Sequence, residues 1–73
     1  MAEPEEVVLS SSAIRSVSYE FDTQTLEIVF QQRGTYTYTS VPESIFRGLV
    51  NAPSAGKYFN LFIRDGFPAQ RSG

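Results

Sequence analysis

The sequence predicts an α+β domain in which a three-stranded antiparallel meander carries two helices on one face, in the order β-β-β-α-α. Two observations lead to this fold class. Apolar and polar residues alternate with period two through three consecutive segments that end at Thr39, which is typical of half-buried strands. After Pro42 the apolar residues recur at helical spacing, in two segments separated by Asn51–Pro53. Three strands under helices make a unit that can fold alone.

The length of 73 residues leaves room for one domain. We expect residues 1–9 to be a disordered acidic tail, residues 10–68 to form the domain, and residues 69–73 to be a loose C-terminal tail. The absence of Cys and His excludes disulfides and thiolate or imidazole metal sites, and we expect no cofactor. No apolar run reaches the roughly 18–20 residues of a membrane span, and the N-terminus does not resemble a secretory signal. We therefore expect a cytoplasmic protein without membrane contact.

The net charge of −2 argues against strong binding to nucleic acid. Its distribution is uneven, because residues 41–73 carry four basic side chains against two acidic ones, whereas residues 1–9 carry three glutamates. The chain is mildly basic toward its C-terminus.

The first hairpin is predicted from two alternating strands around a polar loop, Asp22–Thr25. A four-residue loop pairs Tyr19 with Ile28 and places the apolar side chains of both strands on one face.

The second hairpin allows two registers. A two-residue turn at Arg33 and Gly34 would put Tyr36 and Tyr38 on the polar face. A three-residue loop with Gly34 in the left-handed conformation instead pairs Phe30 with Tyr36 and turns both tyrosines toward the apolar face. We favour the longer loop, because a type I′ turn prefers Asn, Asp or Gly where this chain has Arg33.

Two amphipathic helices are predicted to cover this face. The first follows Pro42 and ends at Asn51–Pro53. Ser54 is the expected N-cap of the second helix, which runs to about Arg64 before Gly66.

Tyr36 and Tyr38 have two possible roles. Exposed aromatic rings on a sheet can stack on unpaired bases. Rings on the covered face would fill the core and leave their hydroxyls at its edge. The longer hairpin loop favours the second, structural role.

The second helix contains the candidate binding residues. Lys57, Asn60 and Arg64 recur at i, i+3 and i+7, so a regular α-helix aligns them on one stripe. Together with the first-turn N–H groups after Ser54 and with the small Gly56, they have the chemistry to contact phosphate. The alternative is a solvated helix face in which Asn60 bonds locally and Arg64 pairs with an acid.

Two other arrangements contain residue types used in catalysis. Glu20 and Glu27 lie opposite each other in the expected register and could share a proton or a divalent ion, although exposed carboxylates usually turn into water. Ser54 stands one turn before Lys57, in the order of a Ser–Lys enzyme, but it is expected to cap the helix while Lys57 points outward. We interpret both as structural and expect neither a catalytic nor a metal-ligating residue.

An ordered series of motifs runs through the chain: Ser11–Ile14, Tyr19, Leu26–Phe30, Gly34, Tyr36–Tyr38, Val41–Pro42, Ala52, Ser54, Gly56, Tyr58–Asn60 and Ile63–Arg64. Together they resemble the KTSC domain family, which is named for its position at the C-terminus of some lysyl-tRNA synthetases and also occurs as small stand-alone bacterial proteins. The resemblance covers roughly residues 9–68 and has the Tyr-x-Tyr pair at its centre. It implies a bacterial protein of unknown function, for which the synthetase partner has suggested RNA binding.

We therefore expect a non-catalytic binding module that contacts RNA, a tRNA-associated protein or another phosphate-bearing partner. Lys57, Asn60 and Arg64 would make the contacts, with added charge from Arg47 and Arg71. The rival expectation is a protein-interaction module that uses the sheet edge or the Thr-rich face. An enzyme is the third and least supported class, and the oligomeric state is left open.

Overall fold

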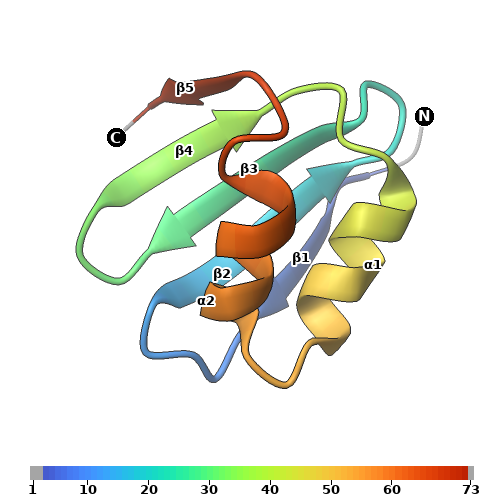
Figure 1. The fold of residues 1–73 in the computed structure, drawn as a ribbon. Coiled ribbons are helices and arrows are strands. Elements are labelled where there is room, and N and C mark those ends of the chain that lie inside the picture. Colours follow the sequence, from blue (N-terminus) through green and yellow to red (C-terminus); the bar gives the residue numbers. More distant parts are fainter. Residues whose placement is uncertain (1–2, 73) are drawn as a thin grey trace.

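The computed structural model describes residues 3–72, which form a five-stranded antiparallel sheet with its helices on one face (Figure 1). The elements in chain order are β1 (Glu5–Val8), β2 (Ile14–Glu20), β3 (Thr25–Phe30), β4 (Gly34–Tyr38), α1 (Glu43–Asn51), α2 (Ala55–Tyr58), η1 (Phe59–Ile63) and β5 (Ala69–Arg71). Here η1 is a π-helical turn that continues α2. The strand order in the sheet follows the chain, from β1 to β5. Within residues 3–72, no helix has the length and hydropathy of a membrane span.

The predicted three-stranded meander is wrong, because one more strand pairs with each of its edges. β1 pairs with β2 and β5 pairs with β4, both antiparallel. β1 carries two adjacent glutamates, and β5 consists of three exposed residues, so neither shows the alternation that identified the other strands. Backbone pairing with a neighbouring strand orders both segments, and that partner is not visible in their own composition.

The first hairpin has the predicted face but a different register. Tyr19 lies opposite Leu26 and Val17 opposite Ile28, because the four-residue loop begins at Phe21, one residue earlier than predicted. A β-bulge between Ile14 and Ser16 then shifts the parity of the strand. Ile14 thereby joins the helix-facing side, where it is fully buried.

The second hairpin has the three-residue loop that was favoured, one position earlier than predicted. Phe30 pairs with Gly34, and Tyr36 and Tyr38 lie opposite Ile28 and Leu26, so the predicted pairing of Phe30 with Tyr36 is wrong. Gly34 has the predicted left-handed conformation, with φ of 84°. Both tyrosines face the helices as predicted, because a shift of two residues keeps the side-chain parity. The side chain of Tyr38 is only 4% exposed.

The core lies between the sheet and the helices. Tyr19, Leu26 and Ile28 from the sheet are fully buried against Phe46 of α1 and Ile63 of η1. Figure 1 shows α1 and α2 side by side across the face of the sheet. The end of β3, the start of β4 and the loop that joins them lie close to the α2–η1 segment.

The second helix begins as predicted but changes geometry halfway. The Ser54 hydroxyl accepts a hydrogen bond from the Lys57 N–H at 3.3 Å, which confirms the predicted N-cap. From Phe59 onward the helix is π-helical, and the Arg64 N–H donates to the Phe59 carbonyl, five residues earlier, at 2.9 Å. A π-helical turn therefore separates Lys57 from Arg64, and such turns are frequent at functional sites.

Candidate binding site

The π-helical turn divides the predicted stripe of binding residues. Lys57, Asn60 and Arg64 are all exposed. An α-helix returns to the same side after seven residues, but the extra residue in the turn rotates Arg64 away from Lys57. Asn60 and Arg64 consequently line two neighbouring hollows, and Lys57 lines neither of them.

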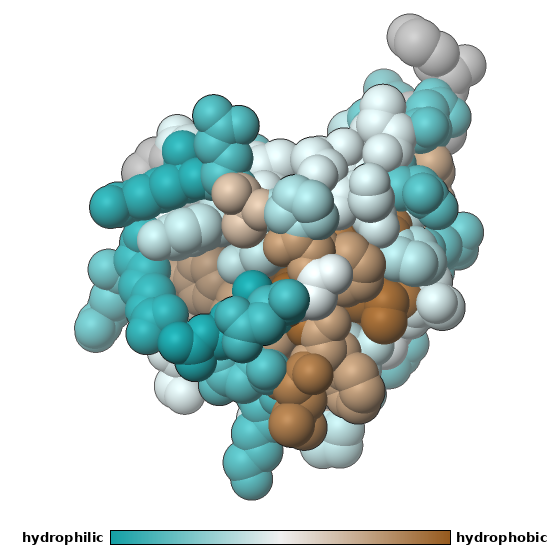
Figure 2. Space-filling model, turned by 45° about the horizontal axis from the view of Figure 1, so that its top comes forward, coloured by the Kyte–Doolittle hydropathy of each residue, from teal (hydrophilic) through white to brown (hydrophobic). Residues whose placement is uncertain are grey.

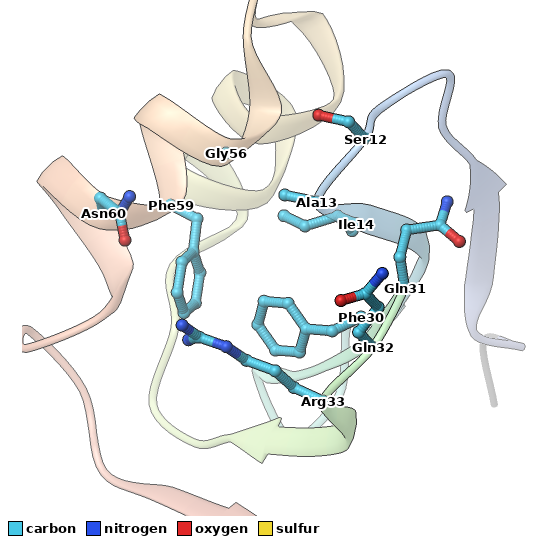
Figure 3. Close-up of a pocket in the computed structure, with 10 residues that line it drawn as sticks. All are labelled: Ser12, Ala13, Ile14, Phe30, Gln31, Gln32, Arg33, Gly56, Phe59 and Asn60. Carbon is cyan, nitrogen blue, oxygen red and sulfur yellow. The ribbon is translucent and has the colours of Figure 1, made fainter.

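The first hollow, here called the amide hollow, lies between the α2–η1 segment and the sheet. Residues 12–14 and 30–33 line it together with Gly56, Phe59 and Asn60, and its volume is about 220 Å³. Figure 3 shows the Phe30 and Phe59 rings at its centre, Asn60 on the helix side and Gln32 on the hairpin side. The two rings meet edge to face, with centroids 5.1 Å apart.

The second hollow, here called the arginine hollow, has a volume of about 260 Å³. It is lined by Phe30, Arg33, Tyr36, Tyr38, Phe59, Arg64, Asp65 and Ala69. Arg33 borders both hollows, and Figure 3 shows its side chain running beneath Phe30 toward Phe59. Within residues 3–72, neither Arg33 nor Arg64 forms an ion pair, although Asp65 lines the same hollow.

The pKa of the Tyr38 phenol responds to the charged side chains that line the arginine hollow. Burial raises the pKa of the Tyr38 phenol, and neighbouring Tyr36 adds to the rise, while the guanidinium groups of Arg33 and Arg64 act in the opposite direction. Two positive charges therefore act on one phenol that remains protonated at neutral pH. A third arginine is close, because Arg71 of β5 lies directly opposite Tyr36 and projects from the same face of the sheet.

Tyr36 and Tyr38 are part of the packing around the hollows. Tyr36 is half-buried and meets Phe30 edge to face at 5.6 Å between centroids, and Tyr38 meets Phe59 in the same way at 5.7 Å. Through these contacts the two rings pack β4 against Phe30 and Phe59, which line both hollows. Neither ring lies on the outer face of the sheet.

Arg47 lies apart from the hollows, in a cluster of its own. Its guanidinium donates to the carboxylates of Glu5 at 2.9 Å and Glu43 at 3.2 Å, and it lies over the rings of Phe21 and Phe46. The hydrogen bond that Arg47 donates to Glu5, followed by the one that it donates to Glu43, raises the pKa of Arg47. Two carboxylates thus balance this arginine, and its contacts connect β1 to α1.

The two glutamates that were predicted to face each other do not do so. Glu27 lies opposite Ser18, and Glu20 lies opposite Thr25. Among residues 3–72, no three acidic side chains come together in a way that could hold a metal ion.

Sequence reasoning missed Arg33, which it treated only as a turn residue. The signal that could have found it is a basic side chain three residues after buried Phe30, at the last position of the hairpin loop. Its hairpin loop lies beside the α2–η1 segment only because the helices fold back over β3 and β4.

Comparisons with known proteins agree on one family. The family model of the KTSC domain matches residues 10–67. A lysine–tRNA ligase of Nostoc punctiforme is 48% identical over 56 residues, which cover 77% of this chain and 10% of the ligase. An uncharacterised protein of Stutzerimonas stutzeri is 38% identical over 58 residues, which cover 80% of this chain and 82% of that protein.

A solved structure gives the same result. The crystal structure of a KTSC domain protein from Yersinia pestis has a TM-score of 0.92 and 36% identity, and the match covers 96% of this chain and 99% of that chain. The match thus spans about a tenth of the lysine–tRNA ligase and nearly all of the Yersinia pestis chain.

Proposed function

Because this chain belongs to the KTSC domain family, we propose that it is a small non-catalytic module that binds RNA or another phosphate-bearing partner at the arginine hollow. Relatives with this domain include lysine–tRNA ligases, in which the matching segment is about a tenth of the protein. A tRNA-associated partner in the cytoplasm is consistent with that occurrence.

The observation that carries the proposal is the pair Arg33 and Arg64. Both side chains border one hollow, both are exposed, and neither has an ion-pair partner within residues 3–72. A guanidinium donates two parallel N–H bonds to a phosphate, which makes arginine well suited to this contact. Since Asp65 offsets one of the two charges, the hollow favours an anion by about one charge.

The tyrosines add neutral donors. Burial raises the pKa of Tyr38 from an ordinary value that is already far above neutral, so its hydroxyl carries a proton at neutral pH and is able to donate to a phosphate oxygen. Asn60, from the stripe predicted in the sequence, lies next to this hollow through their shared neighbours Phe59 and Arg33.

The number of cationic contacts sets the strength of binding. With two or three arginines in contact, affinity should be about micromolar or weaker. For a single strand, the logarithm of affinity should fall with the logarithm of salt concentration at a slope of about −0.7 for each phosphate neutralised.

The test is a titration of a fluorescent single-stranded RNA of about ten nucleotides at low and at moderate salt. We expect the double substitution Arg33→Gln/Arg64→Gln to weaken binding by about tenfold or more and to reduce the magnitude of the salt slope by about 0.7 for each arginine. The matched control is Arg15→Gln/Lys57→Gln, which removes the same charge from exposed positions outside both hollows.

If both double variants lose affinity equally, binding reflects diffuse charge or the Lys57 side of the helix, and the arginine hollow is not the site. Absence of RNA binding by the native protein at low salt would refute the proposed function itself.

The alternative partner is a protein. The Thr-rich strand β4 is an inner strand, so the open edges of the sheet belong to β1 and β5. Leu61 and Phe62 on η1 are 77% and 52% exposed. Figure 2 shows a group of hydrophobic residues on one face of the molecule, next to hydrophilic residues. Amide exchange in a cell extract distinguishes the two cases, because a protein partner should protect edge-strand or η1 amides and an RNA should protect the 31–34 loop.

A further inference from the structure

We propose that the amide hollow receives one unstacked base of a single-stranded nucleic acid, while Arg33 holds the adjoining phosphate. The inference rests on the proposed function, because it concerns the same partner and the neighbouring surface. It adds the chemical class of the group that fills the amide hollow.

Size is the first argument. At about 220 Å³, the amide hollow is smaller than the roughly 300–1,000 Å³ of pockets that enclose drug-sized ligands. It has room for one planar ring system, and not for an extended cofactor.

The walls are suited to such a ring. Phe30 and Phe59 line the hollow with their edge-to-face pair, and Ile14 closes it on the sheet side. Phe30 and Phe59 are only 8% and 5% exposed, so a base would meet ring edges and not an open ring face. The edge of an aromatic ring packs favourably against a π-face, and every base has one. Gly56 lets α2 pack close to Ala13 at this wall, since a Cβ there would come within 3.3 Å of the Ala13 Cβ.

The rim carries the groups that recognise the edge of a base. Gln32 and Asn60 place two carboxamides on opposite sides of the hollow (Figure 3), and each carboxamide both donates and accepts hydrogen bonds. Neither amide side chain has a hydrogen-bond partner within residues 3–72, unlike Gln31, which donates to the Ser11 carbonyl. Such amides pair with exposed base edges in nucleic-acid complexes.

The position of Arg33 connects the two hollows. Its side chain borders both, so a phosphate in the arginine hollow and a group in the amide hollow would share one guanidinium. In a nucleotide, the base and its phosphate are joined by a single sugar. Two adjacent hollows, one with aromatic residues in its lining and amides at its rim and one cationic, match these two parts in kind and in order.

The test compares two oligonucleotides of equal length and charge, a single-stranded RNA and its abasic counterpart. We expect native protein to bind the base-bearing strand about tenfold more tightly. Gln32→Ala/Asn60→Ala should lower that affinity toward the abasic level and leave abasic binding unchanged. Gln70→Ala, an exposed glutamine opposite Thr37 on the outer face of the sheet, is the control and should change neither affinity.

Equal affinity for both strands, with Arg33→Gln/Arg64→Gln still weakening both, would overturn the base pocket and leave the phosphate site intact. Failure of both strands to bind would overturn the two proposals together. A base preference that Gln32→Ala/Asn60→Ala leaves undiminished would overturn the assignment to the amide hollow.

Discussion

At the scale of single residues, Tyr19 shows how one side chain connects the sheet to the segment that leads into α1. Its hydroxyl donates to the backbone carbonyl of Val41, and its ring stacks on Phe46 with centroids 4.8 Å apart. The tyrosine is 1% exposed, so the hydrogen bond lies in the core. The carbonyl of Val41 would lose this donor if the hydroxyl were removed.

Tyr19→Phe should therefore lower the free energy of unfolding by about 1–3 kcal/mol, the usual cost of leaving a buried polar group without its partner. Chemical denaturation measures this difference. Tyr58→Phe serves as the control, because the Tyr58 hydroxyl makes no hydrogen bond to any residue in 3–72 and should matter little. Equal stability of the Tyr19→Phe protein and the native protein would contradict the role given to this hydroxyl.

The residues of the candidate site were only partly visible in the sequence. Helical periodicity drew attention to Asn60 and Arg64, which do border the hollows. It also aligned Lys57 with them, because no local signal announced the π-helical turn. Arg33 escaped notice since its significance comes from the packing of a loop against a helix more than twenty residues later in the chain.

At the scale of elements, the α2–η1 segment depends on how it begins. Its α-helical part has only four residues, so intrinsic helix stability is small and the cap and the packing must hold it. Ser54 supplies the cap through its hydroxyl, and Phe59 and Ile63 supply the packing.

Ser54→Ala should lower the free energy of unfolding by about 1 kcal/mol, within the range of about 0.5–2 for loss of an N-cap. The melting temperature should fall by about 4–8 °C for each kcal/mol in a domain of this size. Ser44→Ala is the matched control, because Ser44 is exposed within α1 and caps no helix, so its replacement should leave stability unchanged or slightly higher. A Ser54→Ala protein as stable as the control would show that packing alone fixes this segment.

The elements that were predicted correctly are those with a strong local pattern. Alternation identified β2, β3 and β4, and helical spacing identified α1 and the start of α2. β1 and β5 lack such a pattern. β1 is held by backbone pairing with β2 and by the contact of Glu5 with Arg47, two partners distant in sequence. The predicted strand pairings of both hairpins are wrong by two residues. Moving a loop by one position shifts the pairing by two residues and leaves every side chain on the same face, so the hydrophobic pattern does not distinguish the two placements.

At the scale of the molecule, three of the acidic side chains lie on the face of the sheet opposite the arginine hollow. Glu6 and Glu27 flank Ser18 across three strands on the outer face of the sheet, and Glu20 projects from the same face. Arg33 and Arg64 lie on the helix side. An overall charge of −2 therefore conceals a local positive site, and this separation would orient an anionic partner toward the hollows.

The whole molecule should also respond to alkaline pH through its buried phenols. Burial raises the pKa of both Tyr19 and Tyr38 above the ordinary value of 10.0. In the unfolded chain these phenols ionise first, so the folded state binds more protons above that pH. The stability contributed by burying them in neutral form is thus fully present below about pH 10 and is lost as pH rises through the folded-state pKa values. Thermal unfolding followed across this range, with tyrosinate absorbance recorded in parallel, should show the loss of stability and the ionisation together.

Tyr19→Phe separates this effect from general repulsion at high pH. The variant starts from a lower stability but has one buried phenol fewer, so its melting temperature should fall less steeply above about pH 10 than that of the native protein. Tyr58→Phe removes one hydroxyl from a partly buried side chain outside the fully buried core, and it is the control that should follow the native slope. If all three proteins lose stability at the same rate, ionisation of Tyr19 does not drive the transition, and the alkaline loss comes from the net negative charge that the chain gains as a whole.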